Sequence, residues 1–297
     1  MILKINQIQT FTKHYFSDLS KSEFQEKQSK FIDGFAGFQD HKWIFYFIGE
    51  NNEFLSFHIQ QDHGNAYILF VTANRNFSSQ QLFKQEFKRL IDEVIKFITK
   101  QFDIFTLESR CLGESDLSKA YPVSDFNLSH TRYEFKKVLD HNSIYSSETI
   151  EFNSYIGWGL SLSEVADIMT ESAIGDPDFS EDDNALECLQ SYLSDSSMYS
   201  QDDCIQVGKI DNEFMSLVIP QSDGTWGTLT YLGIIPKYRK RGLGKDLHKY
   251  GLSCLYKQGT RDYHGGTLET NAAMQRVFQI NSCELYRYLE VWFYKSV

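Results

Sequence analysis

The feature that most constrains how this chain folds is an internal repeat. The string NEFLS at 52–56 returns about 160 residues later as NEFMS at 212–216, and TLE at 106–108 returns at 267–269. Short strings match by chance, but two matches in the same order at nearly the same offset indicate duplication. Two domains also suit the length of 297 residues, because a domain usually contains about 100–200 residues.

Both halves carry the same order of predicted elements. In the first half, strands at 43–48, 54–59 and 66–71 precede a helix at 82–98 and a strand at 102–107. In the second half, strands at 204–207, 214–219 and 228–235 precede a helix at 243–255 and a strand at 267–268. Three consecutive strands and a helical crossover predict antiparallel hairpins and one parallel pair. We therefore expect an α/β (α+β) fold with two domains, 1–140 and 141–297, each a mixed, mostly antiparallel twisted sheet flanked by helices.

Composition excludes several other classes of protein. With 41% hydrophobic and 23% charged residues, the chain is neither disordered nor fibrous. The longest apolar stretch, 43–48, falls far short of the roughly 18 residues of a membrane span, so we expect no membrane partner. The five cysteines are scattered and include no C-x-x-C pair, which predicts reduced thiols and no metal site. The N-terminus turns polar too soon for a secretion signal, and we expect a cytoplasmic protein.

Charge is distributed unevenly along the chain. The net charge of −11 argues against binding to nucleic acid. Between 138 and 208 there are 15 acidic residues and no Lys or Arg, although apolar residues at helical spacing indicate helices at 162–169 and 184–193. Two interpretations of this acidic block stay open: a solvated linker, or a surface made of acidic helices and an acidic loop at 175–178 that attracts cations.

The segment that carries chemistry is 232–245, where a strand leads into a basic, glycine-containing loop that opens a helix. Such a loop directs several unpaired backbone N–H groups and the positive end of the helix dipole to one spot, and glycine lets the backbone approach a bulky anion. This pattern predicts a pyrophosphate site. The Walker motif does not fit, because Asp246 follows Lys245, and the dinucleotide fingerprint fails because Leu247 replaces its third glycine.

Arg239, Gly242 and Gly244 match the pattern R-x-x-G-x-G after a strand and Pro236. This resembles motif A of the GNAT superfamily of N-acetyltransferases, and the resemblance implies acetyl-CoA as co-substrate, with its pyrophosphate on the loop. It also implies that backbone groups of Leu232 and Ile234 pair with the pantetheine amides. The other cofactor-binding residues expected in this loop are Arg239, Lys240, Arg241, Gly242, Leu243, Gly244 and Lys245.

Downstream, the segment NAAM at 271–274 followed by Val277 and Phe278 resembles the family's second cofactor motif, an Asn-led helix beside the pantetheine arm. Asn271, Met274 and Phe278 are therefore further expected cofactor contacts. Many relatives carry, at the position of Phe278, a Tyr that protonates the leaving thiolate, so the general acid stays open. In the first half, 76–81 aligns with the phosphate loop but has no glycine or cation, which predicts a degenerate, structural or acceptor-shaping domain. A tandem chain with one working half also resembles mycothiol synthase-like acetyltransferases.

Direct attack by an amine on the thioester requires a base, because an alkyl amine has a pKa near 10. Glu269 is a candidate base, although its counterpart Glu108 in the half without the loop favours a structural role. Tyr231 and His264 are further candidates, but a lone Tyr or His more often packs or lies at the surface. Tyr286 is a candidate for the missing acid.

The acidic block would border the acceptor pocket by family resemblance, which predicts a cationic primary amine: a polyamine, an aminoglycoside, or a lysine or N-terminal amine of a peptide. The alternative function is a non-catalytic CoA-binding or protein-interaction module, which Phe278 keeps open. Transfer of a longer acyl or an aminoacyl group is a third hypothesis.

Overall fold

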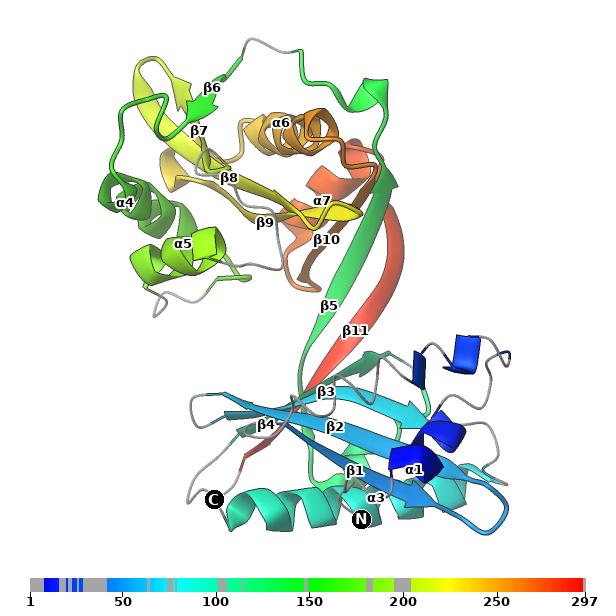
Figure 1. The fold of residues 1–297 in the computed structure, drawn as a ribbon. Helices are drawn as coiled ribbons and strands as arrows, with labels where there is room; N and C mark the ends of the chain where they lie inside the picture. Colours follow the sequence, from blue (N-terminus) through cyan, green and yellow to red (C-terminus); the bar gives the residue numbers. More distant parts are fainter. Residues whose placement is uncertain are drawn as a thin grey trace. The chain divides into compact units, whose positions relative to one another are not determined.

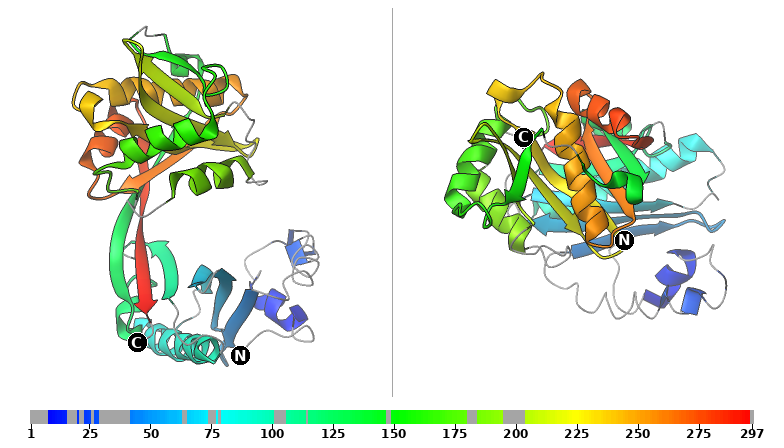
Figure 2. Two further views of the ribbon diagram at one scale, coloured as in Figure 1. Left: turned by 90° about the vertical axis from the view of Figure 1, so that its left-hand side faces the viewer. Right: turned by 90° about the horizontal axis from the view of Figure 1, so that it is seen from above.

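The computed structural model describes residues 8–15, 20, 23–25, 27–28, 42–62, 65–73, 77, 79–100, 106–113, 115–146, 149–179, 184–194 and 204–295. The chain forms two compact units, shown in Figures 1 and 2. The first unit contains Met1–Thr131 and Leu289–Val297, and the second contains Arg132–Tyr288. No helix in the described ranges is both long enough and apolar enough to cross a membrane.

The first unit is a mixed sheet covered by a long helix. Its elements are α1 (Ile8–Tyr15), β1 (Lys42–Ile48), β2 (Phe54–Asp62), β3 (Asn65–Ala73), α3 (Gln80–Thr99), β4 (Thr106–Leu112), the 3₁₀ turn η2 (Tyr121–Ser124) and the end of β11 (Glu284–Lys295). The strands lie in the order β1-β2-β3-β4-β11, and β3 and β4 are parallel. On α3, Phe83, Phe87 and Leu90 recur at helical spacing and are buried in the core, because this spacing places them on one face.

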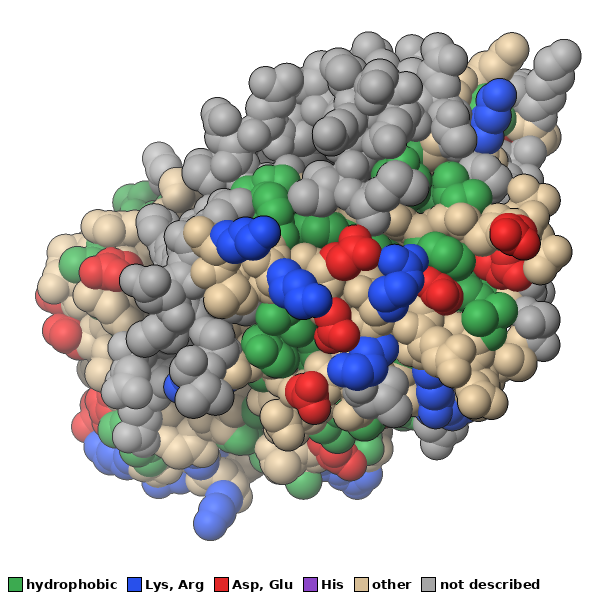
Figure 3. All heavy atoms as spheres, turned by 90° about the horizontal axis from the view of Figure 1, so that it is seen from below, with side chains coloured by type: hydrophobic (Ala, Val, Ile, Leu, Met, Phe, Trp, Pro, Cys, Tyr) green, Lys and Arg blue, Asp and Glu red, His purple; other side chains and the backbone are tan. Residues whose placement is uncertain are grey.

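The outward side of α3 is charged. Arg89 pairs with Glu86 at 2.8 Å and with Glu93 at 3.0 Å, one helical turn apart in each direction. Figure 3, which views the structure from the side of α3, shows acidic and basic side chains interspersed on this face. Charge of both signs therefore covers the solvent side of the helix.

The second unit places helices on both faces of its sheet. Its elements are the end of β5 (Asn127–Val138), the 3₁₀ turn η3 (His141–Ser143), β6 (Glu151–Ser154), α4 (Leu162–Ala173), α5 (Ala185–Ser194), β7 (Gln206–Ile210), β8 (Glu213–Ser222), β9 (Trp226–Ile234), the 3₁₀ turn η4 (Pro236–Tyr238), α6 (Leu243–Lys257), β10 (Asp262–Leu268), α7 (Ala272–Ile280) and the start of β11. The strands lie in the order β5-β10-β9-β8-β7-β6. Along β8, Leu217 and Ile219 pack with α4 and α5, whereas Val218 faces Gly251 of α6.

The predicted fold class and the predicted repeat of elements are confirmed. In each half three antiparallel strands precede a helix and a strand parallel to the third, as β1-β2-β3-α3-β4 and as β7-β8-β9-α6-β10. In both hairpins the register shifts at nearly the same place in the repeat, after His58 in β2 and after Ile219 in β8. Residues 102–105 of one predicted strand, and 181–183 of the acidic block, lie outside the described residues.

Each unit takes one strand from the other half of the sequence. The end of β11, Leu289–Lys295, pairs antiparallel with β4, and Arg132–Val138 of β5 pairs antiparallel with β10. An edge strand presents unpaired backbone groups, and these pairings satisfy them for β4 and β10. The two compact units follow this pairing, and the division into a domain 1–140 and a domain 141–297 stays a prediction.

Candidate active site

A cavity of about 820 Å³ lies in the second unit where β9 and β10 separate. The two parallel strands pair only at their first residues, Trp226 with Asp262 and Gly227 with Tyr263. Beyond this point both strands line the cavity, together with the loop after α4, the start of α6 and one side of α7. The sheet itself therefore opens to make the site.

A bulge in β9 contributes to this opening. The register between β8 and β9 shifts after Ile219, so that Ile219 faces Tyr231 whereas Pro220 faces Leu229, and Thr230 is the extra residue. Proline has no N–H to donate to the ladder, which favours an irregularity at this point. A bulge bends its strand and increases the local twist, and here it lies in the part of β9 that lines the cavity.

The glycine turn at the start of α6 is open toward the cavity. Gly242 has φ +79° and is the N-cap of α6, and none of the side chains that the structure describes caps the first turn. A Cβ at Gly242 would meet no atom within 4 Å, and Gly242 lines the cavity, so no side chain fills the space beside this turn. Gly244 has another role, because a Cβ there would lie 3.2 Å from Val277 of α7. Uncapped amides at a helix N-terminus fit a diphosphate group.

The four basic side chains of this loop differ in their contacts; they are Arg239, Lys240, Arg241 and Lys245. Arg239 donates from Nε to the carbonyl of Ile234 at 2.8 Å, and from its two terminal nitrogens to the carbonyls of Ile174 at 2.6 Å and Ser172 at 2.8 Å. These bonds tie the end of α4 to the end of β9. The side chains of Lys240 and Lys245 are exposed and both residues line the cavity.

Arg241 is the one predicted cofactor residue that does not line the cavity, and its guanidinium lies 5.0 Å from the ring centre of Tyr238. The others do line it: Leu232, Ile234, Arg239, Lys240, Gly242, Leu243, Gly244, Lys245, Asn271, Met274 and Phe278. The structure thus brings almost the whole predicted set together, while their contacts with a cofactor stay predictions.

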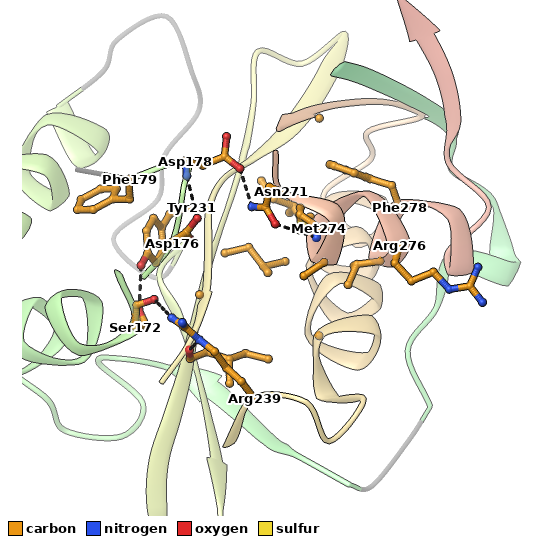
Figure 4. Close-up of a pocket in the computed structure, with 18 of the residues that line it drawn as sticks. Ser172, Asp176, Asp178, Phe179, Tyr231, Arg239, Asn271, Met274, Arg276 and Phe278 are labelled. Atoms are coloured by element: carbon orange, nitrogen blue, oxygen red, sulfur yellow. Dashed lines mark hydrogen bonds between the residues drawn. The ribbon is translucent and has the colours of Figure 1, made fainter. Parts of the chain in front are cut away.

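One wall of the cavity is built by Tyr231 and the end of α4 (Figure 4). The Tyr231 hydroxyl lies 2.9 Å from Ser172 Oγ and donates to the carbonyl of Met169 at 3.3 Å. Burial raises the pKa of Tyr231 to about 12, and the nearby Asp176 carboxylate adds to this effect. Tyr231 therefore keeps its proton at neutral pH and acts as a hydrogen-bond donor.

Asp178, which the sequence did not single out as a site residue, links this wall to the opposite one. Its carboxylate accepts hydrogen bonds from the Leu268 amide at 2.8 Å, from Asn271 Nδ2 at 2.8 Å and from the Thr267 hydroxyl, and it pairs with Arg132 at 3.3 Å. These partners are far away in sequence, so local pattern carries no signal for them. The loop after α4 is consequently held against the end of β10.

The opposite wall is formed by the start of α7 and its apolar side. Asn271 is the N-cap of α7, and its Oδ1 accepts from the Met274 amide at 3.0 Å. Phe278 is 1% exposed and stacks on Phe135 of β5, with ring centres 4.3 Å apart and planes at 13°. This stack supplies an apolar surface and no hydroxyl group.

The remaining catalytic candidates lie outside the cavity lining. Glu269 is exposed in the turn after β10, where the Tyr133 hydroxyl donates to it at 3.4 Å. Tyr286 is 49% exposed on β11, with Lys136 4.9 Å from its ring centre, and His264 lies between the rings of Trp226 and Tyr286. The structure does not bring these three side chains to the cofactor residues, and their catalytic roles stay predictions.

The first unit differs at the corresponding turn, of which Asn76 and Ser78 lie outside the described residues. Ser79 caps α3, and its hydroxyl accepts from the Leu82 amide at 3.1 Å. Phe77 packs against Phe83 at the same helix start. Side chains thus occupy the helix N-terminus that is open at Gly242 in the second unit.

No protein-family model matches the sequence, and a search of curated proteins finds no significant match. Solved structures do match. A GCN5-related N-acetyltransferase from Sphaerobacter thermophilus aligns with TM-score 0.65 and 12% identity, over 99% of this chain and 95% of that one. A tandem GNAT protein from the clavulanic acid biosynthesis pathway aligns with TM-score 0.56 and 9% identity, over 99% and 97%.

This is the fold of the GNAT N-acetyltransferases. A further GCN5-related N-acetyltransferase, from Kribbella flavida, matches with TM-score 0.54 and 10% identity over 84% of this chain and 88% of that one. The predicted resemblance is confirmed at the level of the fold, including the tandem GNAT arrangement. At identities of 9–12% these comparisons establish the fold only, and the reaction has to be inferred from the residues of the site.

Proposed function

We propose that this chain is an acetyl-CoA-dependent N-acetyltransferase that moves an acetyl group directly to a cationic primary amine. The observation that carries the proposal is the uncapped glycine turn at the start of α6, which opens into a cavity between separating parallel strands. A helix start of this kind binds anions through its free amides and its dipole. The cavity is large enough for an organic ligand.

Different residues of the cavity would bind different parts of acetyl-CoA. The first amides of α6 would hold the diphosphate, and the exposed ammonium groups of Lys240 and Lys245 would add positive charge there. Leu232 and Ile234 offer backbone groups to the pantetheine arm, and Phe278 offers an apolar surface. When bound, the co-substrate supplies an activated thioester to this site.

The remaining groups suit an amine acceptor. The wall formed by Ser172, Asp176 and Tyr231 contains a carboxylate and hydroxyl groups, which favours a cation over an anion. Holding amine and thioester together in one cavity supports direct transfer, and backbone N–H groups of β9 at the bulge are candidates to stabilise the developing oxyanion. The first unit, with its capped helix start, serves a structural or acceptor-shaping role in this proposal.

One observation favours the alternative, a module that binds CoA without catalysis. Phe278 presents no hydroxyl, and the ring is fixed by its stack on Phe135. A site of this kind would retain the cofactor contacts and lack a proton donor for the thiolate at this position.

The two functions are separated by binding and turnover measured on the full chain. Calorimetry with CoA tests the phosphate turn, and thiol release from acetyl-CoA is then followed with spermidine, an aminoglycoside, a peptide with a free N-terminus and, for comparison, glutamate. We expect heat on binding and thiol release with cationic amines. Binding without release would favour the alternative, release with glutamate alone would exclude a cationic acceptor, and the absence of heat would refute the CoA site.

A further inference from the structure

We propose that Asp176 receives the acceptor amine: its carboxylate binds the ammonium group and removes the proton that must leave before the nitrogen attacks. This inference rests on the proposed N-acetyl transfer and assigns the acceptor end of the same site. It gives the role of base to a residue other than Glu269.

Asp176 lies where an acceptor amine could reach it. Asp176 is half-buried on the loop after α4 and lines the cavity, on the same wall as Tyr231 (Figure 4). The glycine turn and the α7 side make up other parts of the lining. An amine bound at Asp176 and a thioester held along β9 would therefore share one cavity, whereas Glu269 is exposed outside its lining.

The second support is that the carboxylate is fixed but not neutralised. Asp176 Oδ1 accepts a hydrogen bond from the amide of Asp178 at 3.0 Å. Among the described residues, no side chain donates a hydrogen bond to Asp176 or pairs with it. Arg239, whose charge acts on the Asp176 carboxyl, donates its hydrogen bonds to three backbone carbonyls, and Arg132 of the cavity lining pairs with Asp178. A partly buried carboxylate that is not paired with a cation is costly, so the cavity is suited to a ligand that brings one.

The third support is the rigidity of the loop. Asp178, two residues further on, is held by the Thr267 hydroxyl, the Leu268 amide, the Asn271 side chain and Arg132. Because the amide that bonds Asp176 belongs to Asp178, these anchors also determine where the Asp176 carboxylate lies. A base must be held at hydrogen-bonding distance from the proton it takes, and a tethered loop meets this need.

The electrostatic surroundings suit a base. Burial raises the pKa of the Asp176 carboxyl from its ordinary 3.8, and the charge of Asp178 adds to this, whereas the hydrogen bond from the Asp178 amide and the charge of Arg239 oppose it. The other titratable groups lining the cavity nearby are Tyr231 of β9 and Tyr192 of α5. A carboxylate with a raised pKa holds a transferred proton better than an ordinary one does.

The ammonium group gives one proton to Asp176, and the freed nitrogen lone pair forms a bond to the thioester carbonyl carbon. The C–S bond then breaks with its electron pair on sulfur, and the second nitrogen proton moves to that sulfur. Asp176 returns its proton to solvent, which leaves the N-acetyl amine, the thiol of CoA and one released proton.

The test is Asp176→Asn in the full chain, assayed by thiol release with the best amine of the panel. General base catalysis typically contributes about 100- to 10,000-fold, so kcat/KM for the amine should fall by at least about 100-fold. KM for acetyl-CoA should stay unchanged, because Asp176 lies outside the phosphate turn. Asparagine retains an oxygen for the Asp178 amide, so the melting temperature should stay the same, and Asp176→Glu should restore part of the activity.

The pH profile distinguishes a base from a structural residue. Since the pKa of Asp176 is raised, wild-type kcat/KM should fall as the pH drops through a value above 3.8, and this limb should vanish in Asp176→Asn. Glu171→Gln, which removes the same charge from an exposed position on α4, is the matched control and should retain full activity.

Three results would overturn the inference. Activity of Asp176→Asn within about threefold of wild type would exclude Asp176 as the base. Loss of the acidic limb in Glu269→Gln and its retention in Asp176→Asn would assign the base to Glu269 instead. Absence of thiol release from the wild-type chain with every amine would overturn the proposed function itself, and this inference with it.

Discussion

Arg239→Lys tests whether the guanidinium of Arg239 serves the fold or the phosphates. Arg239 donates to three carbonyls at 2.6–2.8 Å, and a lysine can replace one of these bonds. A hydrogen bond from a charged group contributes about 1.5–3 kcal/mol, and partial exposure reduces this to about 1 kcal/mol for each bond here. Losing two bonds should lower the free energy of unfolding of the second unit by about 2 kcal/mol, which corresponds to a fall of about 4–8 °C in Tm.

Scanning calorimetry of the full chain measures this fall, and titration with CoA at a temperature where both proteins are folded measures the binding site. We expect a lower Tm and a Kd for CoA within about twofold of wild type, because lysine retains the positive charge. An unchanged Tm together with much weaker CoA binding would refute the reasoning, since it would assign the guanidinium to the phosphates.

Three further predictions concern single side chains. Lys245→Ala should raise the Kd for CoA about tenfold at low salt and less at high salt, which titration at two ionic strengths would measure. A rise in Kd that does not depend on salt would contradict a charge contact. Burial lowers the pKa of His248 from 6.5 to about 3, so the free energy of unfolding should fall as the pH drops from 6.5 toward 3. Urea unfolding of His248→Gln should depend less on pH in this range, and an unchanged pH dependence would contradict the prediction. Phe278→Tyr adds a hydroxyl beside Phe135 and should lower the free energy of unfolding by about 1–3 kcal/mol; an unchanged Tm would mean that the hydroxyl finds a partner.

Much of the fold was predictable because its determinants are local. The spacing of Phe83, Phe87 and Leu90 marks α3, and the repeated NEFLS and NEFMS strings mark the start of the second strand of each hairpin. The pairing of β11 with β4 was not predictable, because a strand pattern specifies an apolar face and does not name the partner strand.

The cofactor half of the candidate site was easier to predict than the acceptor half. Gly242 and Gly244 lie in one contiguous motif, Gly242 with a positive φ that favours glycine and Gly244 close to Val277. Arg239 was expected at the phosphates because its charge is visible in sequence, while its three carbonyl partners are not. Asp178 depends on partners about 90 residues away, so its importance is visible only in the folded chain.

The exchanged strands determine the order in which the two units can be completed during translation. Once β10 has been translated, the second unit lacks only the start of β11 among its strands. The partner of β10, β5, has been translated before it. In the first unit, β4 has an unpaired edge until Leu289–Lys295 has been translated, which happens after the strands β6 to β10 of the second unit. The first unit, most of which is translated before the second unit, is therefore completed after it.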